Sequence, residues 1–294
     1  MKFIHFLTQG IVLKRKNNQL VVYENDKKIR AYPLSFFDVI YVYGNVQISP
    51  SLMNFLLDNN KFIAFFDKKG RYKGITIGKN KFSNEKNRIK QYEIYFSEEK
   101  RLSFSKYLIL EKTNRIEKVF SLDLSKYKEK INQANSLTSL LGLEGVVSNQ
   151  MFNEFRILLK EIGLAFKKRE YNPPPDKINS ILSSFYMLYY NFLIPFSVAN
   201  GFDPFLGIFH IKRGTHHAFV SDLMEVIRPD ITYLVYEFLK ENPLNEIPFN
   251  EDENNCFLSA EGLRKIIEWV HLNEYEILIN EPVDFVKNIE INLL

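Results

Sequence analysis

Residues 79–90 read KNKFSNEKNRIK, a polar and basic stretch that separates two parts of the 294-residue chain. Only two of these twelve residues are apolar, which favours an exposed linker. Before the stretch apolar residues alternate as in strands, and after it they recur at helical spacing. We therefore expect an α+β fold: a β-rich, sandwich-like N-terminal domain over residues 1–78, a basic linker over 79–90, and a larger all-α C-terminal domain over 91–294.

The first 78 residues alternate short apolar runs with turn residues. Asn17 and Asn18 lie between two such runs and tolerate the positive φ of a tight hairpin turn. Ser49 followed by Pro50 is typical of a helix N-cap with proline in the first turn, which predicts one short helix inside this domain. The expected strands are residues 3–7, 11–14, 20–23, 39–43, 62–66 and 72–77.

The segment after the linker has the periodicity of amphipathic helices. Pro173–Pro175 cannot donate backbone hydrogen bonds and interrupt this pattern, and Asp176 begins the next helix. The apolar stripe of the first long helix contains Leu137, Leu140, Leu141, Val147, Met151, Phe155 and Leu158.

The composition is that of a folded globular protein, with 46% apolar and 25% charged residues. No apolar run approaches the roughly 20 residues that cross a bilayer, and Met1–Gln9 alternates like a strand instead of forming an export signal. Cys256 is the only cysteine, which excludes an intramolecular disulfide and a cysteine-built zinc or iron–sulfur site. We expect a cytoplasmic protein.

Charge is distributed unevenly along the chain. Residues 1–90 hold 17 Lys and Arg against 6 Asp and Glu, a net charge of +11, whereas residues 91–294 carry a net charge of −7. This asymmetry indicates a polyanionic partner such as DNA, because Lys and Arg release counterions from phosphates on binding. The densest basic stretch is 61–90, and a solvated hairpin rim is the alternative. Residues 230–294 hold 14 acids and 4 bases, which favours packing within the protein or contact with a protein partner.

One carboxylate is predicted to lie on an inward helix face. Glu144 has Val147, Met151 and Phe155 as helical neighbours. Burying an uncompensated carboxylate costs several kcal/mol on a rough scale, so Glu144 should be paired, protonated or bound to a cation. A salt bridge to a nearby Arg or Lys and a metal site both meet this need.

Two further acids and a histidine form a second cluster. Asp222 and Glu225 are three residues apart, which puts both on one helix face, where their repulsion favours a bound cation. His210 precedes them closely enough to fold over them. One imidazole with carboxylates suits Mn²⁺ or Mg²⁺ better than zinc, and a structural histidine beside unrelated acids is the alternative.

Several other residues are candidates for binding rather than for metal ligation. Cations beside a carboxylate cluster can hold a phosphate, and tyrosines can line a site, stack on bases or belong to the core. His216 and His217 are left unassigned, because adjacent side chains in a loop rarely converge on one ion. The candidates are Lys212, Arg213 and Arg228 for phosphate, and Tyr186 and Tyr190 for the lining of the site.

Several segments, spread over nearly the whole chain, match one known family in their order. They are Pro33–Gly44, Ser49–Gly70, Leu141–Gly145, Pro173–Asp176, Gly201–Pro204, Gly207 with His210, Asp222–Glu225, Arg228–Pro229 and Leu258–Gly262. In this order they resemble the CRISPR-associated integrase and endonuclease of spacer acquisition, the first-numbered of the Cas proteins. Phe185, Phe202 and Ile227 depart from the commoner residues of that family, which leaves the subtype and the DNA-end preference open.

The resemblance implies that Glu144, His210 and Glu225 hold a Mn²⁺ or Mg²⁺ ion and that Asp222 is an accessory catalytic acid. It implies a catalytic helical domain that joins a prespacer 3′-hydroxyl to CRISPR leader–repeat DNA. It also implies a homodimer that binds double-stranded DNA and the second-numbered Cas protein, a small ferredoxin-like dimer. A non-catalytic DNA-binding scaffold and a general branched-DNA repair nuclease are the alternatives.

Overall fold

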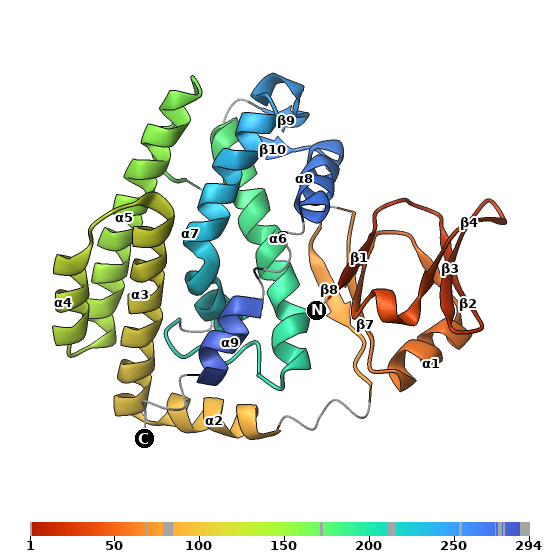
Figure 1. The fold of residues 1–294 in the computed structure, drawn as a ribbon, viewed down its shortest axis with the longest axis horizontal. Helices are drawn as coiled ribbons and strands as arrows, with labels where there is room; N and C mark the ends of the chain where they lie inside the picture. The colour runs from red at the N-terminus through yellow and green to blue at the C-terminus, as the bar shows by residue number, and fades with distance from the viewer. Residues whose placement is uncertain are drawn as a thin grey trace. The chain divides into compact units, whose positions relative to one another are not determined.

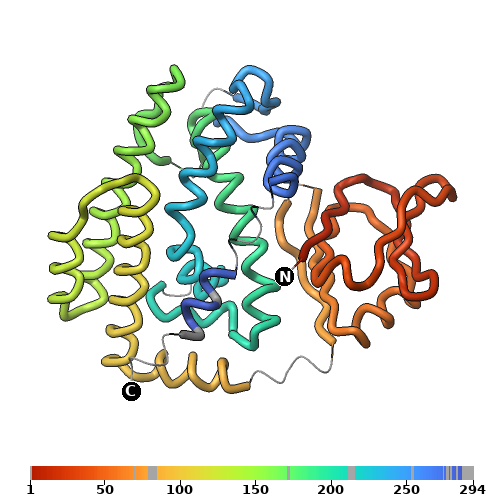
Figure 2. Tube along the Cα trace, viewed as in Figure 1, coloured from red at the N-terminus to blue at the C-terminus, as the bar shows by residue number. Residues whose placement is uncertain are grey.

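The computed structural model describes residues 2–68, 70–78, 85–170, 173–210, 216–252, 255–273, 275, 278 and 280–288. The predicted order is confirmed: strands come first, and a mostly helical part follows (Figure 1). The chain forms two compact units, Met1–Lys86 with Val198–Gly201, and Asn87–Ser197 with Phe202–Leu294. Figure 2 shows that each unit is made from a nearly continuous part of the chain.

The first unit contains two four-stranded sheets. In one sheet three neighbouring strands run parallel and the fourth is antiparallel. In the other sheet three strands form an antiparallel meander, and a short strand joins its edge in parallel. In spatial order the first sheet contains β1 (Phe3–Phe6), β5 (Val39–Tyr43), β7 (Phe62–Phe66) and β8 (Tyr72–Ile75), and the second contains β4 (Lys27–Pro33), β3 (Gln19–Glu24), β2 (Val12–Lys16) and β6 (Gln47–Ile48).

The core of this unit is built from both sheets together with helix α1 (Pro50–Asp58). The predicted N-cap is confirmed, since the Ser49 hydroxyl accepts a hydrogen bond from the Leu52 N–H at 3.3 Å. The prediction of a β-rich first domain is also confirmed. Its buried apolar side chains include Ile4, Phe6, Leu13, Leu20, Val22, Ile40, Val42, Leu56 and Ile63.

A local signal accounts for the predicted hairpin, whereas strand β4, which was not predicted, has no such signal. Asn17 has a φ of 53° in the turn between β2 and β3, as expected for an asparagine in a tight hairpin. Strand β4 at the edge of its sheet has exposed Lys27, Lys28 and Arg30, so it shows no apolar alternation. Main-chain hydrogen bonds to β3 define it instead.

The second unit is mostly helical. Helices α3, α5 and α7 pack against one another, and α4 packs against α3 and α5 (Figure 1). The helices are α2 (Glu85–Phe96), α3 (Glu98–Phe120), α4 (Ser125–Gln133), α5 (Leu137–Glu161), α6 (Lys177–Ala199), α7 (Ala218–Glu241), α8 (Ala260–Leu272) and α9 (Asn280–Asn288). A short 3-10 turn occupies Leu244–Glu246, and another, Leu34–Phe36, lies in the first unit.

The all-α prediction for this part omitted a small sheet. Strands β9 (Phe249–Glu251) and β10 (Cys256–Leu258) form an antiparallel pair. Each has three residues, too few to show a period of two.

Helix α2 begins at Glu85, inside the range 79–90 that the sequence analysis assigns to a linker, and residues 79–84 lie outside the described residues. The buried residues of α2 are Gln91 and Ile94, so the helix has almost no apolar stripe. The Gln91 amide donates to the Asp203 carbonyl at 2.9 Å and to the Leu206 carbonyl at 2.7 Å. A buried polar side chain therefore docks this helix, which explains why hydropathy did not reveal that it begins before Gln91.

Helix α6 starts where predicted, with Asp176 Oδ1 accepting from the Asn179 N–H at 2.8 Å. Its length and a mean hydropathy of 1.3 over its most apolar window would suit a membrane span. In that window 72% of the residues are buried inside the protein, which is the behaviour of a core helix.

Ser49→Ala is expected to lower the free energy of unfolding by about 1 kcal/mol, because it removes the hydroxyl that satisfies the Leu52 N–H. Ser51→Ala, at an exposed position in the same turn, is the matched control and should change stability by less than about 0.5 kcal/mol. Urea denaturation followed by circular dichroism measures both. Equal stability of the two variants would contradict the capping role.

Candidate active site

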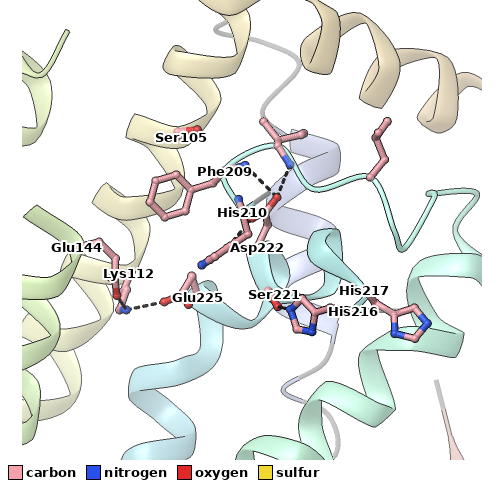
Figure 3. A network of polar contacts seen from close by, with 12 residues as sticks. Ser105, Lys112, Glu144, Phe209, His210, His216, His217, Ser221, Asp222 and Glu225 are labelled. Atoms are coloured by element: carbon pink, nitrogen blue, oxygen red, sulfur yellow. Dashed lines mark hydrogen bonds and ion pairs between the residues drawn. The ribbon is translucent and has the colours of Figure 1, made fainter. Parts of the chain in front are cut away.

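Three helices of the second unit direct charged side chains toward a common point. Lys112 comes from α3, Glu144 from α5 and Glu225 from α7 (Figure 3). The Lys112 ammonium donates to Glu225 Oε2 at 2.5 Å, to Ser148 Oγ at 2.8 Å and to Glu144 Oε1. Ser148 also donates to Glu144 Oε1 at 2.6 Å. Two of the predicted metal ligands, Glu144 and Glu225, therefore meet on one cation.

This ammonium is fully enclosed, since the Lys112 side chain is 0% exposed. Burial by itself lowers the pKa of a lysine, but the carboxylates of Glu225 and Glu144 outweigh that effect and raise the pKa of Lys112 above its ordinary value. The buried lysine is therefore charged and has the two anionic partners that such a cation needs.

Glu225 has a second cationic partner on its own helix. Arg228, one turn further along α7, donates from Nη2 to Glu225 Oε1 at 2.8 Å and from Nε to the same oxygen at 3.1 Å. Burial raises the pKa of Glu225, yet Arg228, Lys112 and His210 together hold it well below its usual range. Glu225 is ionised, so it accepts hydrogen bonds or binds a cation.

Asp222 is buried and accepts four hydrogen bonds. Its Oδ2 accepts from the N–H groups of Ile208 at 2.6 Å and Phe209 at 3.1 Å, and its Oδ1 accepts from the His210 N–H at 2.9 Å. The fourth partner is His210 Nδ1, 2.8 Å from Oδ1. Asp222 therefore holds the segment that carries His210 in place. Both Asp222 oxygens are engaged in these hydrogen bonds.

Gly207 allows this segment to approach α7 closely. A Cβ at position 207 would lie 2.3 Å from the His210 carbonyl oxygen and 2.7 Å from Ala218 Cβ. No side chain fits there, so the turn ahead of His210 requires glycine.

The His210 imidazole is anchored through one nitrogen only. Because Asp222 Oδ1 also accepts a backbone N–H, it acts as an acceptor, and Nδ1 carries the proton. Burial lowers the pKa of His210, but the hydrogen bond to Asp222 and the charges of Asp222 and Glu225 raise it overall. Nε2 has no hydrogen-bond partner among the residues that the structure describes, which leaves this nitrogen for a ligand.

Arg228 and Tyr186, two of the predicted binding residues, contact each other. The Arg228 guanidinium lies over the Tyr186 ring, 5.0 Å from its centroid, and Arg169 lies over the same ring at 5.4 Å. The Tyr186 hydroxyl is 2.6 Å from Thr232 Oγ1, and the residue is 7% exposed. Tyr186 thus anchors the arginine that holds Glu225, and little of its ring is accessible to a base.

Tyr190, the other predicted tyrosine, belongs to a separate cluster. Its hydroxyl lies 3.2 Å from His216 Nδ1 and accepts from the His217 N–H at 2.9 Å. His216 Nε2 in turn lies 2.6 Å from Ser221 Oγ. Burial raises the pKa of Tyr190 to about 12. Figure 3 shows His216 and His217 away from Lys112 and Glu144. Lys212 and Arg213 lie outside the described residues.

The sequence analysis missed Lys112, although a signal for it exists. On α3, Leu108, Lys112 and Ile116 recur every four residues, and all three are buried. A lysine on an apolar stripe must have a buried counter-charge. That spacing could have indicated a carboxylate partner, but not which one.

The side chains that could hold a metal ion are Glu144, Glu225 and His210. Two carboxylates that already share one cation, with an imidazole nitrogen left for a ligand, are a donor set that fits a hard divalent ion. In this arrangement Lys112 stands between the acids. As placed here the three predicted ligands are not yet grouped around one point, since within the described part of the chain no three His, Cys, Asp or Glu side chains lie close enough together to hold a metal ion.

Comparisons with known proteins cover almost the whole chain. A sequence profile for the family described as CRISPR associated protein Cas1 matches residues 4–271. A CRISPR-associated endonuclease Cas1 of Thermodesulfovibrio yellowstonii is 27% identical over 285 residues, which cover 89% of this chain and 89% of the relative.

Solved structures share the fold. A Cas1 protein from Thermotoga maritima aligns with a TM-score of 0.79 and 20% identity, and covers 99% of this chain and 97% of its own. A chain of a partial Cas6-RT-Cas1–Cas2 complex aligns with a TM-score of 0.69 and 20% identity, and the alignment covers 100% of this chain and 97% of that chain. A casposase bound to integration product aligns with a TM-score of 0.61 and 21% identity, and the alignment covers 91% of this chain and 85% of the casposase chain.

The two-unit fold, the converging acids and these matches define a CRISPR-associated protein. More particularly, the chain belongs to the Cas1 family, because that family's profile spans nearly its full length.

Asp222→Asn is expected to lower the pKa of His210, because the substitution removes the carboxylate that raises it. Because the folded state favours protonated His210, this histidine contributes stability. The contribution is fully present below about pH 6.5, the ordinary pKa of histidine, and is lost as the pH rises through the raised pKa of the folded state. The variant should therefore lose more stability at about pH 6 than at about pH 9. An NMR titration of the metal-free protein measures the pKa, and Asp203→Asn is the charge-matched control. An unchanged His210 pKa would contradict the assignment.

Proposed function

We propose that this protein is a divalent-metal-dependent DNA endonuclease and integrase of CRISPR adaptation. In this role it transfers the 3′-hydroxyl of a prespacer onto leader–repeat DNA by transesterification. The observation that carries the proposal is the meeting of Glu144 and Glu225 on one buried cation, together with the His210 imidazole, whose Nε2 has no partner among the described residues. Cas1 relatives named as endonucleases support the reaction class.

Glu144, Glu225 and His210 would hold Mn²⁺ or Mg²⁺. When bound, such an ion neutralises charge on the attacked phosphate and lowers the pKa of the attacking hydroxyl. Asp222 keeps the imidazole ring oriented with its Nδ1 protonated, the usual arrangement for a metal-binding histidine. Arg228 keeps Glu225 ionised and in place. Asp222 would thus act by positioning His210, with its own oxygens engaged.

Cations of this chain would hold the DNA backbone. Lys212 and Arg213 directly follow the His210 segment and remain candidates from the sequence. Arg228 could add a phosphate contact from its anchored position over Tyr186. In the first unit, the exposed Arg71 and Lys73 belong to the basic stretch 61–90. Contacts of this kind read the phosphate backbone and DNA shape rather than base edges.

The proposed assembly is a homodimer that binds double-stranded DNA and a Cas2-type partner. Similarity to Cas1 in a Cas6-RT-Cas1–Cas2 complex supports the partner, and similarity to a casposase bound to integration product supports DNA joining. The acidic segment 230–294 is a poor DNA surface, which favours protein contact there.

One alternative has a specific observation in its favour. Lys112, Glu144, Glu225 and Arg228 form a charge-balanced network, which a DNA-binding scaffold could use for structure alone. A general branched-DNA nuclease is the other alternative. Comparing strand transfer into a leader–repeat target with transfer into a random duplex separates it from the integrase.

Glu144→Gln and His210→Ala are each expected to slow Mn²⁺-dependent DNA cleavage and strand transfer by roughly 100-fold or more, because each removes a metal ligand. DNA binding at fixed salt should stay nearly unchanged, since neither residue belongs to the basic stretch. Glu161→Gln, at an exposed position at the end of α5, is the matched control for Glu144. Full activity in Glu144→Gln and His210→Ala would favour the scaffold.

Combined Arg71→Glu and Lys73→Glu substitutions are expected to weaken DNA binding and to flatten its salt dependence. Two lost phosphate contacts reduce the slope of log affinity against log salt by roughly 2. Lys126→Glu with Lys130→Glu, exposed on α4, makes the same change in net charge. DNA affinities measured across a series of salt concentrations give the slope for each double variant. Equal slopes for the two double variants would reassign Arg71 and Lys73 to simple solvation.

A further inference from the structure

We propose that Lys112 is a built-in counter-cation that occupies the carboxylate pair while no metal is bound, and that a divalent ion displaces it. This inference rests on the proposed function, because it concerns the same acids. It assigns to a lysine of α3 control over how tightly the site binds metal.

The Lys112 ammonium has a complete set of hydrogen-bond partners. An ammonium has three N–H donors, and Glu144, Ser148 and Glu225 supply three acceptors. The side chain is 0% exposed, so water does not compete for these donors. The nitrogen is therefore held at one defined position between α5 and α7.

The Lys112 ammonium lies where a metal ion shared by the two acids would have to lie. Mg²⁺ binds carboxylate oxygens at roughly 2.0–2.1 Å, so an ion held by both acids would lie between their oxygens. Lys112 Nζ already occupies the space between them, where it bonds both Glu225 Oε2 and Glu144 Oε1. Two cations cannot occupy that space, and their charges repel strongly in a buried setting. Binding of an ion by both acids therefore requires the ammonium to leave.

The two acids differ in their exposure to solvent, which indicates how a metal ion could replace the ammonium. The Glu144 side chain is 22% exposed, whereas Glu225 is 3% exposed and is also bound to Arg228. Access is therefore easier on the Glu144 side of the pair. Ser148 Oγ remains as an acceptor for an ammonium that has moved, and the four-carbon stem of a lysine permits such movement.

Lys112 also explains how the acids can be brought together in the metal-free protein. Two carboxylates at one buried point repel each other and lose solvation, unless a cation is present. The lysine supplies that cation from within the chain. Its presence should stabilise the metal-free state and, for the same reason, weaken metal binding.

Lys112→Met keeps an unbranched side chain that is one atom shorter and removes the charged ammonium, so it tests both of these effects. The variant is expected to bind Mn²⁺ roughly tenfold or more tightly than the wild type, since a competing charge has gone. Its metal-free form should melt at a lower temperature than the wild type, and Mn²⁺ should raise that temperature more than in the wild type. Lys118→Met, exposed on the same helix, is the matched control and should resemble the wild type.

Electron paramagnetic resonance of free Mn²⁺ measures the affinity without DNA, and circular dichroism follows the thermal transition. Mn²⁺ that is bound by the wild type and lost in Glu144→Gln defines the site. Equal or weaker Mn²⁺ binding by Lys112→Met would overturn the inference and leave the proposed function intact. Absence of any such Mn²⁺ site in the wild type would instead overturn the proposed function and this inference with it.

Lys112→Met could also fail to fold without metal. Folding that returns on addition of Mn²⁺ would support the inference, because the ion then replaces the missing charge. A variant that stays unfolded at every Mn²⁺ concentration would contradict it, because the lysine would then be needed for more than its charge.

Discussion

The helical unit depends on one electrostatic constraint: an ammonium shut off from water must have carboxylates beside it. Lys112 meets this constraint through Glu144 and Glu225, and so ties α3 to α5 and α7. Leaving a buried charge without its partner costs roughly 3–5 kcal/mol, which restricts how these helices can pack. The contacts that stabilise the packing are therefore the same contacts that gather the acids needed for metal chemistry.

A second constraint acts on the segment before α7. Its backbone N–H groups are turned toward one point, and a single carboxylate, Asp222, accepts three of them as well as the His210 ring. The imidazole is thus oriented by the fold. Arg228 acts in a similar way on Glu225, with Tyr186 beneath its guanidinium. Such preorganisation limits the rearrangement that ligand binding requires.

Elements with a local signal could be predicted from the sequence, and elements without one could not. Ser49 before Pro50 marked α1, and Asn17 marked a hairpin, because capping and positive φ depend on neighbouring residues only. Strand β4 is polar and exists through pairing with β3, while α2 docks through the buried amide of Gln91. Strand β4 and the start of α2 depend on partners that lie elsewhere in the chain, so their own residues did not reveal them.

The sequence by itself determined the division into a strand-rich and a helical part, the excess of positive charge in the first 90 residues, and the spacing that puts Asp222 and Glu225 on one helix face. Only the tertiary structure decided which cation meets Glu144 and Glu225. Lys112 lies 32 and 113 residues away from them, and helix packing alone brings the three together. A local pattern can show that a buried charge needs a partner, but the partner's identity depends on distant contacts.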